Sequence, residues 1–394
     1  MKPFRVGLIG SGGISRTYVE AFQHVPDADV VAVWSRQREN AERFGREHGI
    51  SLATDRVEDL LPQVDVVCVN SPNACHAPHA IAAAGAGKHV IVEKPLAVSL
   101  EEGQAIVDAC ADAGVGLAYA EELPFVPKFE RAREILESGA LGEILYLTQR
   151  EAHGGPYSPW FFTRDEAGGG VLMDMACHAI ELVRWVLGKP PVAKVTAHVA
   201  NALHRDKTEL EDHSVIHLEF ADGITATCEA SWVLQGGMQS RLELWGTEGY
   251  LDVDLLHGSG LELYTHRGSP QHMAPPGWTM TLTNWVVENG YPQELSHFLQ
   301  CFREGTTPRE SGADGLVVLE ILLAAYVSAA TGPTAARPHR RAGIARPVAP
   351  WLHTLSSGGR SLRSCVWRRQ TKDRKERPRF RDRLAAGGLA SVYC

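Results

Sequence analysis

The amino-terminal stretch of the chain combines three features that few folds accommodate. A short apolar run, Phe4–Ile9, leads into the turn Gly10-Ser11-Gly12-Gly13, and a helical pattern follows from Ile14 to His24. Glycines at such positions permit a tight turn and let backbone N–H groups approach a pyrophosphate at the helix N-terminus. Only Ser15 departs from the usual Gly-x-Gly-x-x-Gly/Ala spacing. The pattern predicts a dinucleotide-binding strand–turn–helix unit, the alternative being a glycine turn that only begins a helix.

Further β-branched runs alternate with helical patterns along the first third of the chain. They are Val30–Trp34, Val64–Asn70, His89–Val92 and Leu117–Ala120. Such alternation is typical of a parallel sheet covered by helices on both faces. Because 394 residues exceed what one hydrophobic core usually serves, we expect two domains. The sequence therefore predicts an α/β Rossmann domain over residues 1–121.

The pattern changes in the second half of the chain. Alternating apolar and polar residues recur in six segments: 144–153, 193–200, 213–220, 224–233, 240–246 and 249–256. Helical patterns surround or interrupt them at 129–137, 173–187, 293–303 and 312–331. We expect an α+β domain over residues 122–334, with an open, mainly antiparallel sheet that has one covered face.

The last sixty residues have a different composition. Residues 335–394 carry 15 Lys and Arg against 3 Asp and Glu, and hydrophobic periodicity stops. We expect a disordered or atypical basic tail, with a nucleic-acid-binding tail as the less favoured alternative and no specific nucleic-acid partner. No apolar run of membrane-spanning length and no signal-peptide pattern stand out, so we expect a cytoplasmic protein without a membrane partner. Eight scattered cysteines without a close pair predict reduced thiols.

The residues after the second predicted strand bear on cofactor choice. An acidic residue there usually binds the ribose 2′-hydroxyl of NAD, whereas positive groups accommodate the 2′-phosphate of NADP. Here the stretch offers Ser35, Arg36 and Arg38 and no carboxylate. NADP is therefore favoured over NAD, although the same stretch could be a solvated loop with NAD bound less selectively.

Two longer motifs make a family resemblance specific. The segment Gly87–Ala97 reads GKHVIVEKPLA and Gly168–His178 reads GGGVLMDMACH, while SPNACH at 71–76 follows the third predicted strand. Together they resemble the signatures of the Gfo/Idh/MocA oxidoreductase family over roughly residues 4–332. The resemblance implies a nicotinamide cofactor bound beside the 71–76 loop. The residues assigned to cofactor binding are Gly10, Gly12, Gly13, Ile14, Ser35, Arg36, Arg38, Ser71, Pro72, Asn73, His76, Glu93 and Lys94.

The resemblance and the residue chemistry together suggest a catalytic centre. Asp174 and His178 are four residues apart, so on a helix they share one face. A carboxylate beside an imidazole raises its basicity and fixes its tautomer, which suits a general base. The ammonium of Lys94 can stabilise negative charge on a reacting oxygen. By resemblance, His178 takes the hydroxyl proton, Lys94 assists and Asp174 tunes the pair. Taken singly, Lys94 could be a surface lysine and His178 a core histidine.

Candidate substrate contacts are weaker. Glu121 and Glu122 stand where many relatives carry Asn, Tyr or Arg, and they could contact sugar hydroxyls or serve as helix-start acids. Tyr157 and Trp160 could stack on a pyranose or anchor a loop. We assign no metal, because the spacing of Asp174, His178 and nearby histidines matches no standard ligand set.

We therefore expect hydride transfer between NADP or NAD and a ring hydroxyl of a sugar, inositol or related cyclic polyol, in a homodimer or homotetramer. A redox-assisted, NAD-dependent glycosidase and a non-catalytic nucleotide-sensing regulator are the alternatives. The joint presence of Lys94, Asp174 and His178 disfavours a sensor, which needs no base.

Overall fold

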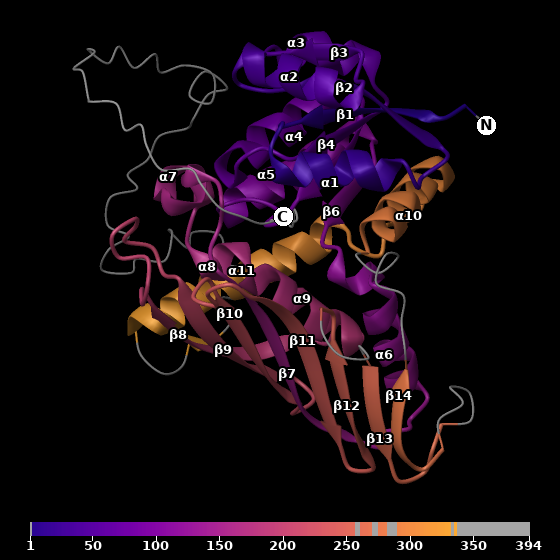
Figure 1. Cartoon of the computed structure of the whole chain (residues 1–394), viewed down its shortest axis with the longest axis vertical. Coiled ribbons are helices and arrows are strands. Elements are labelled where there is room, and N and C mark those ends of the chain that lie inside the picture. Colours follow the sequence, from indigo (N-terminus) through magenta and orange to yellow (C-terminus); the bar gives the residue numbers. More distant parts are fainter. Residues whose placement is uncertain (1, 257–260, 270–274, 282–289, 332–334, 337–394) are drawn as a thin grey trace, which may run out of the picture. The chain divides into compact units, whose positions relative to one another are not determined.

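The computed structural model describes residues 2–256, 261–269, 275–281, 290–331 and 335–336. In the first 125 residues six strands form a parallel sheet in the order β3-β2-β1-β4-β5-β6 (Figure 1). The strands are β1 (Phe4–Ile9), β2 (Ala28–Trp34), β3 (Leu52–Thr54), β4 (Val66–Val69), β5 (His89–Glu93) and β6 (Leu117–Ala120). The helices are α1 (Gly13–Phe22), α2 (Arg38–His48), α3 (Val57–Leu60), α4 (His76–Gly85) and α5 (Leu100–Ala113), with short 3-10 turns η1 (Leu61–Gln63), η2 (Asn73–Cys75) and η3 (Leu123–Phe125).

The Rossmann prediction is confirmed, apart from β3. That strand has three residues and pairs only with β2 at the sheet edge, so the sequence offered too short a run to detect. The apolar strands β1, β4 and β5 are continuous buried runs because helices cover both of their faces.

The second half holds a nine-stranded sheet in the order β14-β13-β12-β11-β7-β10-β9-β8-β15. Its strands are β7 (Ile144–His153), β8 (Val192–Ala200), β9 (His213–Phe220), β10 (Thr225–Ser231), β11 (Met238–Gly246), β12 (Gly249–Asp254), β13 (Leu261–Thr265), β14 (Gly277–Thr281) and β15 (Ala335–Ala336). All neighbours are antiparallel except β7 and β10, which run parallel. The predicted open, mainly antiparallel sheet is thus confirmed, with three strands more than the pattern indicated.

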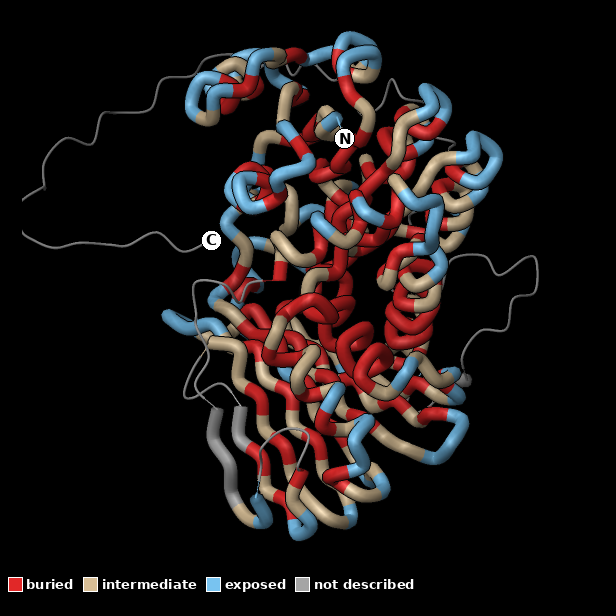
Figure 2. Tube along the Cα trace, turned by 90° about the vertical axis from the view of Figure 1, so that its right-hand side faces the viewer, coloured by how far each residue is buried: buried red, intermediate tan, exposed pale blue. Residues whose placement is uncertain are grey.

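One face of this sheet is covered by helices. The helices of the second half are α6 (Pro127–Glu137), α7 (Arg164–Ala167), α8 (Val171–Asp174), α9 (Ala176–Val186), α10 (Tyr291–Glu304) and α11 (Gly312–Thr331), with the turn η4 (Pro159–Phe162). Helix α9 packs on β7 and β10, and α11 packs on β8. Along β9 every second residue is buried, and Figure 2 shows the same alternation in neighbouring strands. The other face is polar, with Arg150 paired to Glu229 at 2.6 Å.

The last two helices return to the first half of the chain. Phe298 and Leu299 of α10 belong to the same apolar cluster as Val6 and Ile91 of the parallel sheet. Helix α10 lies beside α1 (Figure 1), and α11 contacts α5. Residues 122–334 therefore do not form a separate core, and the buried face of their sheet belongs to one apolar cluster with residues of the parallel sheet. The chain order could not show this, because burial on a distant sheet leaves no local pattern.

Two further expectations change. Helix α11 is long and apolar enough to cross a membrane by length and composition, which we had not expected, but most of it is buried against the protein. The predicted tail begins with a strand, since Ala335 and Ala336 pair with Val195 and Lys194 of β8. Backbone pairing needs no apolar periodicity, so composition did not reveal it. Residues 337–394 lie outside the described part of the chain.

Candidate active site

The glycine turn after β1 is tightly packed at Gly10 and surrounded by open space at Gly12 and Gly13. Gly10 has φ +133°, and a Cβ there would collide with the backbone carbonyl of Asn70. Ser15 donates to the Gly10 carbonyl oxygen at 3.0 Å and accepts from Asn70 at 3.3 Å, so this departure from the usual spacing ties the turn to β4. By contrast, a Cβ at Gly12 or Gly13 would meet nothing within 4 Å. No side chain caps α1, which leaves its first N–H groups available to a phosphate.

The residues after β2 lie at the protein surface. Arg36 pairs with Glu166 at 3.3 Å and Arg38 pairs with Glu42 at 2.8 Å, and both guanidinium groups are mostly exposed. Exposed ion pairs contribute little stability, so either side chain can exchange its partner for a 2′-phosphate. Ser35 is buried at the strand end. The assignment of these three residues to cofactor binding stays a prediction.

The loop after β4 uses its side chains to hold itself together. Both ring nitrogens of His76 lie 2.8 Å from backbone carbonyl oxygens, those of Pro95 and Ser71. Burial lowers the pKa of His76 to about 4, despite its hydrogen bonds to backbone groups. Asn73 donates to the carbonyl of Ala167 at 2.9 Å. These contacts hold the loop in place from within the protein. The assignment of His76 and Asn73 to cofactor binding stays a prediction.

Lys94 and Asp174 form a buried ion pair between the two halves of the chain. Lys94 follows β5, and its Nζ donates to Asp174 Oδ1 at 3.0 Å and to the Asp174 backbone carbonyl at 2.7 Å. The second carboxylate oxygen accepts from Trp232 Nε1 at 3.0 Å. Burial lowers the pKa of Lys94, but Asp174 more than offsets this and the net shift is upward. Burial raises the pKa of Asp174, but Lys94 reverses that shift, so both groups are charged at neutral pH.

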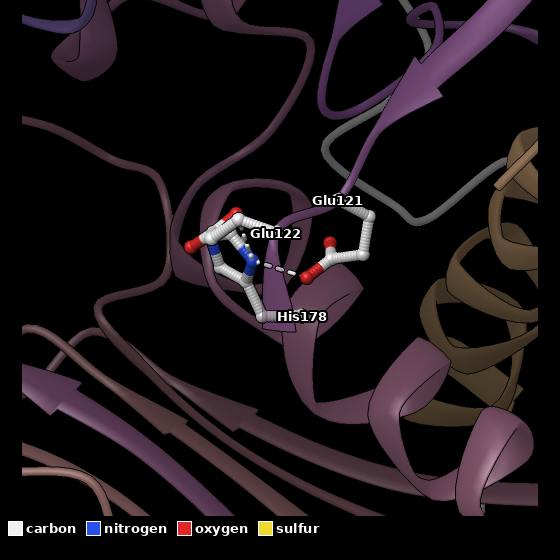
Figure 3. A group of neighbouring side chains, drawn as sticks. All are labelled: Glu121, Glu122 and His178. Atoms are coloured by element: carbon white, nitrogen blue, oxygen red, sulfur yellow. Dashed lines mark hydrogen bonds and ion pairs between the residues drawn. The ribbon is translucent and has the colours of Figure 1, made fainter. Parts of the chain in front are cut away.

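The partner of His178 is Glu121 and not Asp174. His178 Nδ1 lies 2.7 Å from Glu121 Oε1, as the dashed line in Figure 3 shows, and 3.6 Å from Glu122 Oε2. The expected Asp174–His178 pairing is wrong, because the helix is interrupted at Met175 and the Asp174 carboxylate is turned to Lys94. Glu121 comes from the end of β6, which local helix spacing could not indicate.

Burial sets the charge states around this histidine. Burial lowers the pKa of His178 to about 4, because its effect is larger than the opposing effect of the Glu122 charge. It also raises the pKa of Glu121 to about 8, partly offset by Lys94. Glu93, whose carboxylate accepts the Lys94 backbone N–H at 3.1 Å, has its pKa raised to about 8 by burial as well. Between about pH 4 and pH 8 the His178–Glu121 pair therefore holds one proton more than it does at alkaline pH.

The three glycines before α8 are required because neighbouring groups pack too closely to leave room for a Cβ atom. A Cβ at Gly169 would collide with Tyr326, and one at Gly170 would collide with Glu211. Glu211 accepts the backbone N–H groups of Gly170 and Leu172 at 2.9 and 3.2 Å, and the Tyr326 hydroxyl at 2.7 Å. This buried carboxylate at the start of α8 fixes the segment that carries Asp174. Neither Glu211 nor Trp232 has a sequence signal that could have identified it.

The substrate assignments are only partly supported by position. Glu121 is fully buried behind His178, so its role there is to orient the imidazole. Glu122 is 14% exposed and faces the same imidazole. Tyr157 is 87% exposed, and the ring of Trp160 stacks on Phe161 at 3.7 Å, which occupies one face of the indole. The carbohydrate-stacking role of both aromatic residues stays a prediction.

Two groups in the described part of the chain have the donor atoms of a metal site. One is Glu121, Glu122 and His178, and the other is Glu181, Glu310 and Asp314. In the second group the ammonium of Lys189 lies 2.8–3.2 Å from all three carboxylates, so a cation of the protein itself is already at the centre.

Comparison with known proteins identifies the family of this chain. The family model described as an oxidoreductase family with an NAD-binding Rossmann fold matches residues 4–121, and the GFO/IDH/MocA C-terminal domain model matches residues 129–252. The chain belongs to the Gfo/Idh/MocA family. It is therefore an NAD(P)-dependent oxidoreductase with the two-part fold that the sequence motifs implied.

Similar proteins cover most of the chain. The 1,5-anhydro-D-fructose reductase of Ensifer adhaerens is 30% identical over 84% of this chain and 98% of its own length. The scyllo-inositol 2-dehydrogenase (NAD(+)) of Bacillus subtilis is 28% identical over 78% and 88%. The structure of GenD2 from gentamicin A biosynthesis, in complex with NAD, has a TM-score of 0.77 and 31% identity over 86% of this chain and 97% of that one. Levoglucosan dehydrogenase in complex with NADH and L-sorbose gives 0.78 and 26% over 86% and 100%.

Proposed function

We propose that this protein transfers a hydride between a nicotinamide dinucleotide and a ring hydroxyl of a sugar, inositol or related cyclic polyol. One observation carries the proposal: Lys94 and His178 are each fixed by a carboxylate from the other half of the chain, and the charge of Lys94 acts on the imidazole of His178. The relatives named for reactions on anhydrofructose, inositol and levoglucosan support this substrate class.

The pairs Lys94–Asp174 and His178–Glu121 have different roles at the substrate hydroxyl. The oxidised nicotinamide, when bound, supplies the hydride acceptor. His178 donates its Nδ1–H to the ionised Glu121, which leaves the lone pair of Nε2 to accept the hydroxyl proton. Lys94 donates a hydrogen bond to the same oxygen and stabilises the negative charge that develops there as the hydroxyl proton leaves, before the hydride passes from carbon to the nicotinamide. Asp174 and Trp232 keep the ammonium in place.

The number of protons on the His178–Glu121 pair links the direction of the reaction, oxidation or reduction, to pH. Oxidation needs an unprotonated Nε2, which the pair offers after it loses the proton that titrates at about pH 8. Reduction needs a proton donor, which the singly protonated pair supplies below that pH. The same residues thus serve both directions, and the ambient pH selects between them.

A substrate screen tests the function. Sugars and inositols are offered with NAD or NADP, reduced cofactor is followed by absorbance and products are identified by mass spectrometry. We expect oxidation of ring hydroxyls with reduced cofactor formed in equal amount. A broken glycosidic bond without accumulation of reduced cofactor would instead identify the redox-assisted glycosidase, and cofactor binding without any turnover would identify the nucleotide sensor.

We also propose that NADP binds at least as tightly as NAD. The support is the absence of a carboxylate at the end of β2 and the presence of Arg36 and Arg38 in weak, exposed pairs. Ser35→Asp should shift the ratio of the two dissociation constants toward NAD by about tenfold, because a carboxylate repels the 2′-phosphate. The exposed Asp55→Asn provides a charge control. Strong NAD preference in the unmodified protein would contradict the proposal.

The assembly and location follow from weaker support. The polar outer face of the nine-stranded sheet is a suitable surface for a homodimer or homotetramer, and we also propose a cytoplasmic location. Sedimentation at several protein concentrations measures the first, and cell fractionation the second. The partner we expect is the small-molecule substrate, with no specific nucleic acid and no membrane.

A further inference from the structure

Carboxylates outnumber available cations around His178. The ligand atoms of Glu121, Glu122 and His178 lie within 4.8 Å of one another (Figure 3). His178 adds no positive charge to balance them at neutral pH, because burial lowers its pKa to about 4. Two neighbouring acidic side chains therefore share one neutral imidazole. A buried carboxylate without a countercharge is costly, so burial raises the pKa of both carboxyl groups, and an arriving cation would favour their ionised form.

Lys94 supplies only part of the missing charge, because it lowers the pKa of Glu121 and Glu122 less than burial raises them. Its ammonium is held by both the side chain and the backbone carbonyl of Asp174, at 3.0 and 2.7 Å. The charges of Lys94 and Asp174 balance each other, and this lysine is committed to the reacting oxygen. Glu121 and Glu122 consequently remain without a cation of their own.

Glu294 adds an independent observation. This residue of α10 is fully buried, and both of its carboxylate oxygens lack a hydrogen-bond partner in the described part of the chain. Burial raises the pKa of Glu294 well above its usual value, and the nearby charges of Glu122, Glu93 and Glu121 raise it further. An unpartnered carboxyl group of a third element thus lies within electrostatic reach of the same cluster, so acidic groups from the ends of β5 and β6 and from α10 influence one another there.

Glu122 is the member of the cluster that a ligand can reach. Glu121 is fully buried and already accepts from His178. Glu122 is 14% exposed, and its Oε2 lies 3.6 Å from His178 Nδ1, beyond a direct hydrogen bond. A divalent metal would compete for the same imidazole nitrogen that donates to Glu121, whereas an ammonium needs only acceptors.

We propose that the substrate of this enzyme carries a protonated amino group, as in an amino sugar or aminocyclitol, and that the carboxylate of Glu122 receives it. This inference rests on the proposed function and narrows its substrate class. The ammonium donates to Glu122, and its positive charge favours ionisation of the neighbouring Glu121 and Glu294, whose pKa values burial raises. Lys94 and His178 act on a hydroxyl of the same ring.

Matched substrate pairs test the proposal. The 2-, 3-, 4- and 6-amino-deoxyglucoses are compared with glucose, and scyllo-inosamine with scyllo-inositol, at pH 7. We expect at least one amine to exceed its hydroxyl parent in kcat/KM by about tenfold to a hundredfold, the range of a charge-assisted hydrogen bond. Its N-acetyl derivative, which lacks the charge, should lose that advantage. Glu122→Gln should bring the amine-to-hydroxyl ratio close to one, whereas Glu101→Gln, on an exposed position of α5, should leave the ratio as it is.

A binding measurement separates failure of this inference from failure of the proposed function. Dissociation constants of the same pairs are measured by calorimetry with the NADPH-bound or NADH-bound protein. Tighter binding of amines that depends on Glu122 supports the inference even without turnover. Equal or weaker binding and turnover of every amine overturns it while leaving polyol oxidation intact. Tight binding of Mn²⁺ or Zn²⁺ that Glu122→Gln abolishes, with no amine preference, would show a metal site and also overturn it.

Discussion

The parallel sheet of the first half and the helices of the second half each supply one member of both catalytic pairs. Lys94 and Glu121 stand at the ends of strands β5 and β6, whereas Asp174 and His178 stand on the short helix α8 and on α9. The strand ends are held by the sheet ladder and by nearby contacts such as that of His76 with the Pro95 carbonyl. The helical side is fixed by contacts far apart in sequence, such as those of Glu211 and Trp232. The positions of Lys94 and His178 therefore depend on how the two halves of the chain pack against each other.

The two pairs also differ in their charge states. Lys94–Asp174 is a charged pair, in which each partner stabilises the ionised form of the other. His178–Glu121 is a pair in which burial disfavours charge on both partners and one proton is shared over a wide pH range. The first pair is suited to constant electrostatic assistance, and the second to proton transfer.

The largest expected effect comes from removing either acting group. Lys94→Ala or His178→Ala should lower turnover by on the order of a hundredfold or more while cofactor binding survives, since both residues act on the substrate oxygen. Turnover and cofactor fluorescence titrations measure the two quantities. Because Lys94→Ala leaves the Asp174 carboxylate buried without its partner, the double variant Lys94→Ala/Asp174→Asn serves as a folding control. Near wild-type turnover in either single variant would remove that residue from the catalytic centre.

A smaller, pH-dependent effect should come from the positioning carboxylate. In the unmodified enzyme the rate of alcohol oxidation should rise as pH increases through about 8, because the raised pKa of Glu121 keeps the pair protonated below that value. Glu121→Gln cannot ionise, so this limb should disappear and oxidation at pH 9 should fall by about tenfold.

The matched control removes another buried carboxylate that is outside the two pairs. Glu151 on β7 accepts from Gln149 and Ser240, and burial also raises its pKa. Glu151→Gln should keep the limb near pH 8. If Glu121→Gln keeps it too, the titrating group is not the His178–Glu121 pair.

The smallest effect is expected at the end of the chain. Deleting the residues after Pro338 keeps β15 and every motif of the site, so melting temperature and turnover should match those of the full chain. The sequence reason is that the deleted segment has no apolar periodicity with which to build a core. Loss of activity, or a fall of several degrees in melting temperature, would show that residues beyond Pro338 contribute to the stability or activity of the second half of the chain.

Most of the local structure could be predicted from the sequence. The span of α11 agrees with the pattern residue for residue, and β1 and β6 do as well. Long periodic runs determine these elements because their period matches one secondary structure only. The three-residue β3, the two-residue β15 and the interruption at Met175 were missed, because each is too short to produce a period.

The sequence by itself determined the fold class, the glycine turn, the family and the residue types of the catalytic centre, since each is carried by a contiguous motif. Only the tertiary structure decided how those residues pair. Asp174 is four positions from His178, yet it is bound by Lys94, eighty residues away. His178 is bound by Glu121, fifty-seven residues away. Charge pairing and burial depend on distance in space, and the packing of two sheets against shared helices sets that distance without leaving a pattern in the chain.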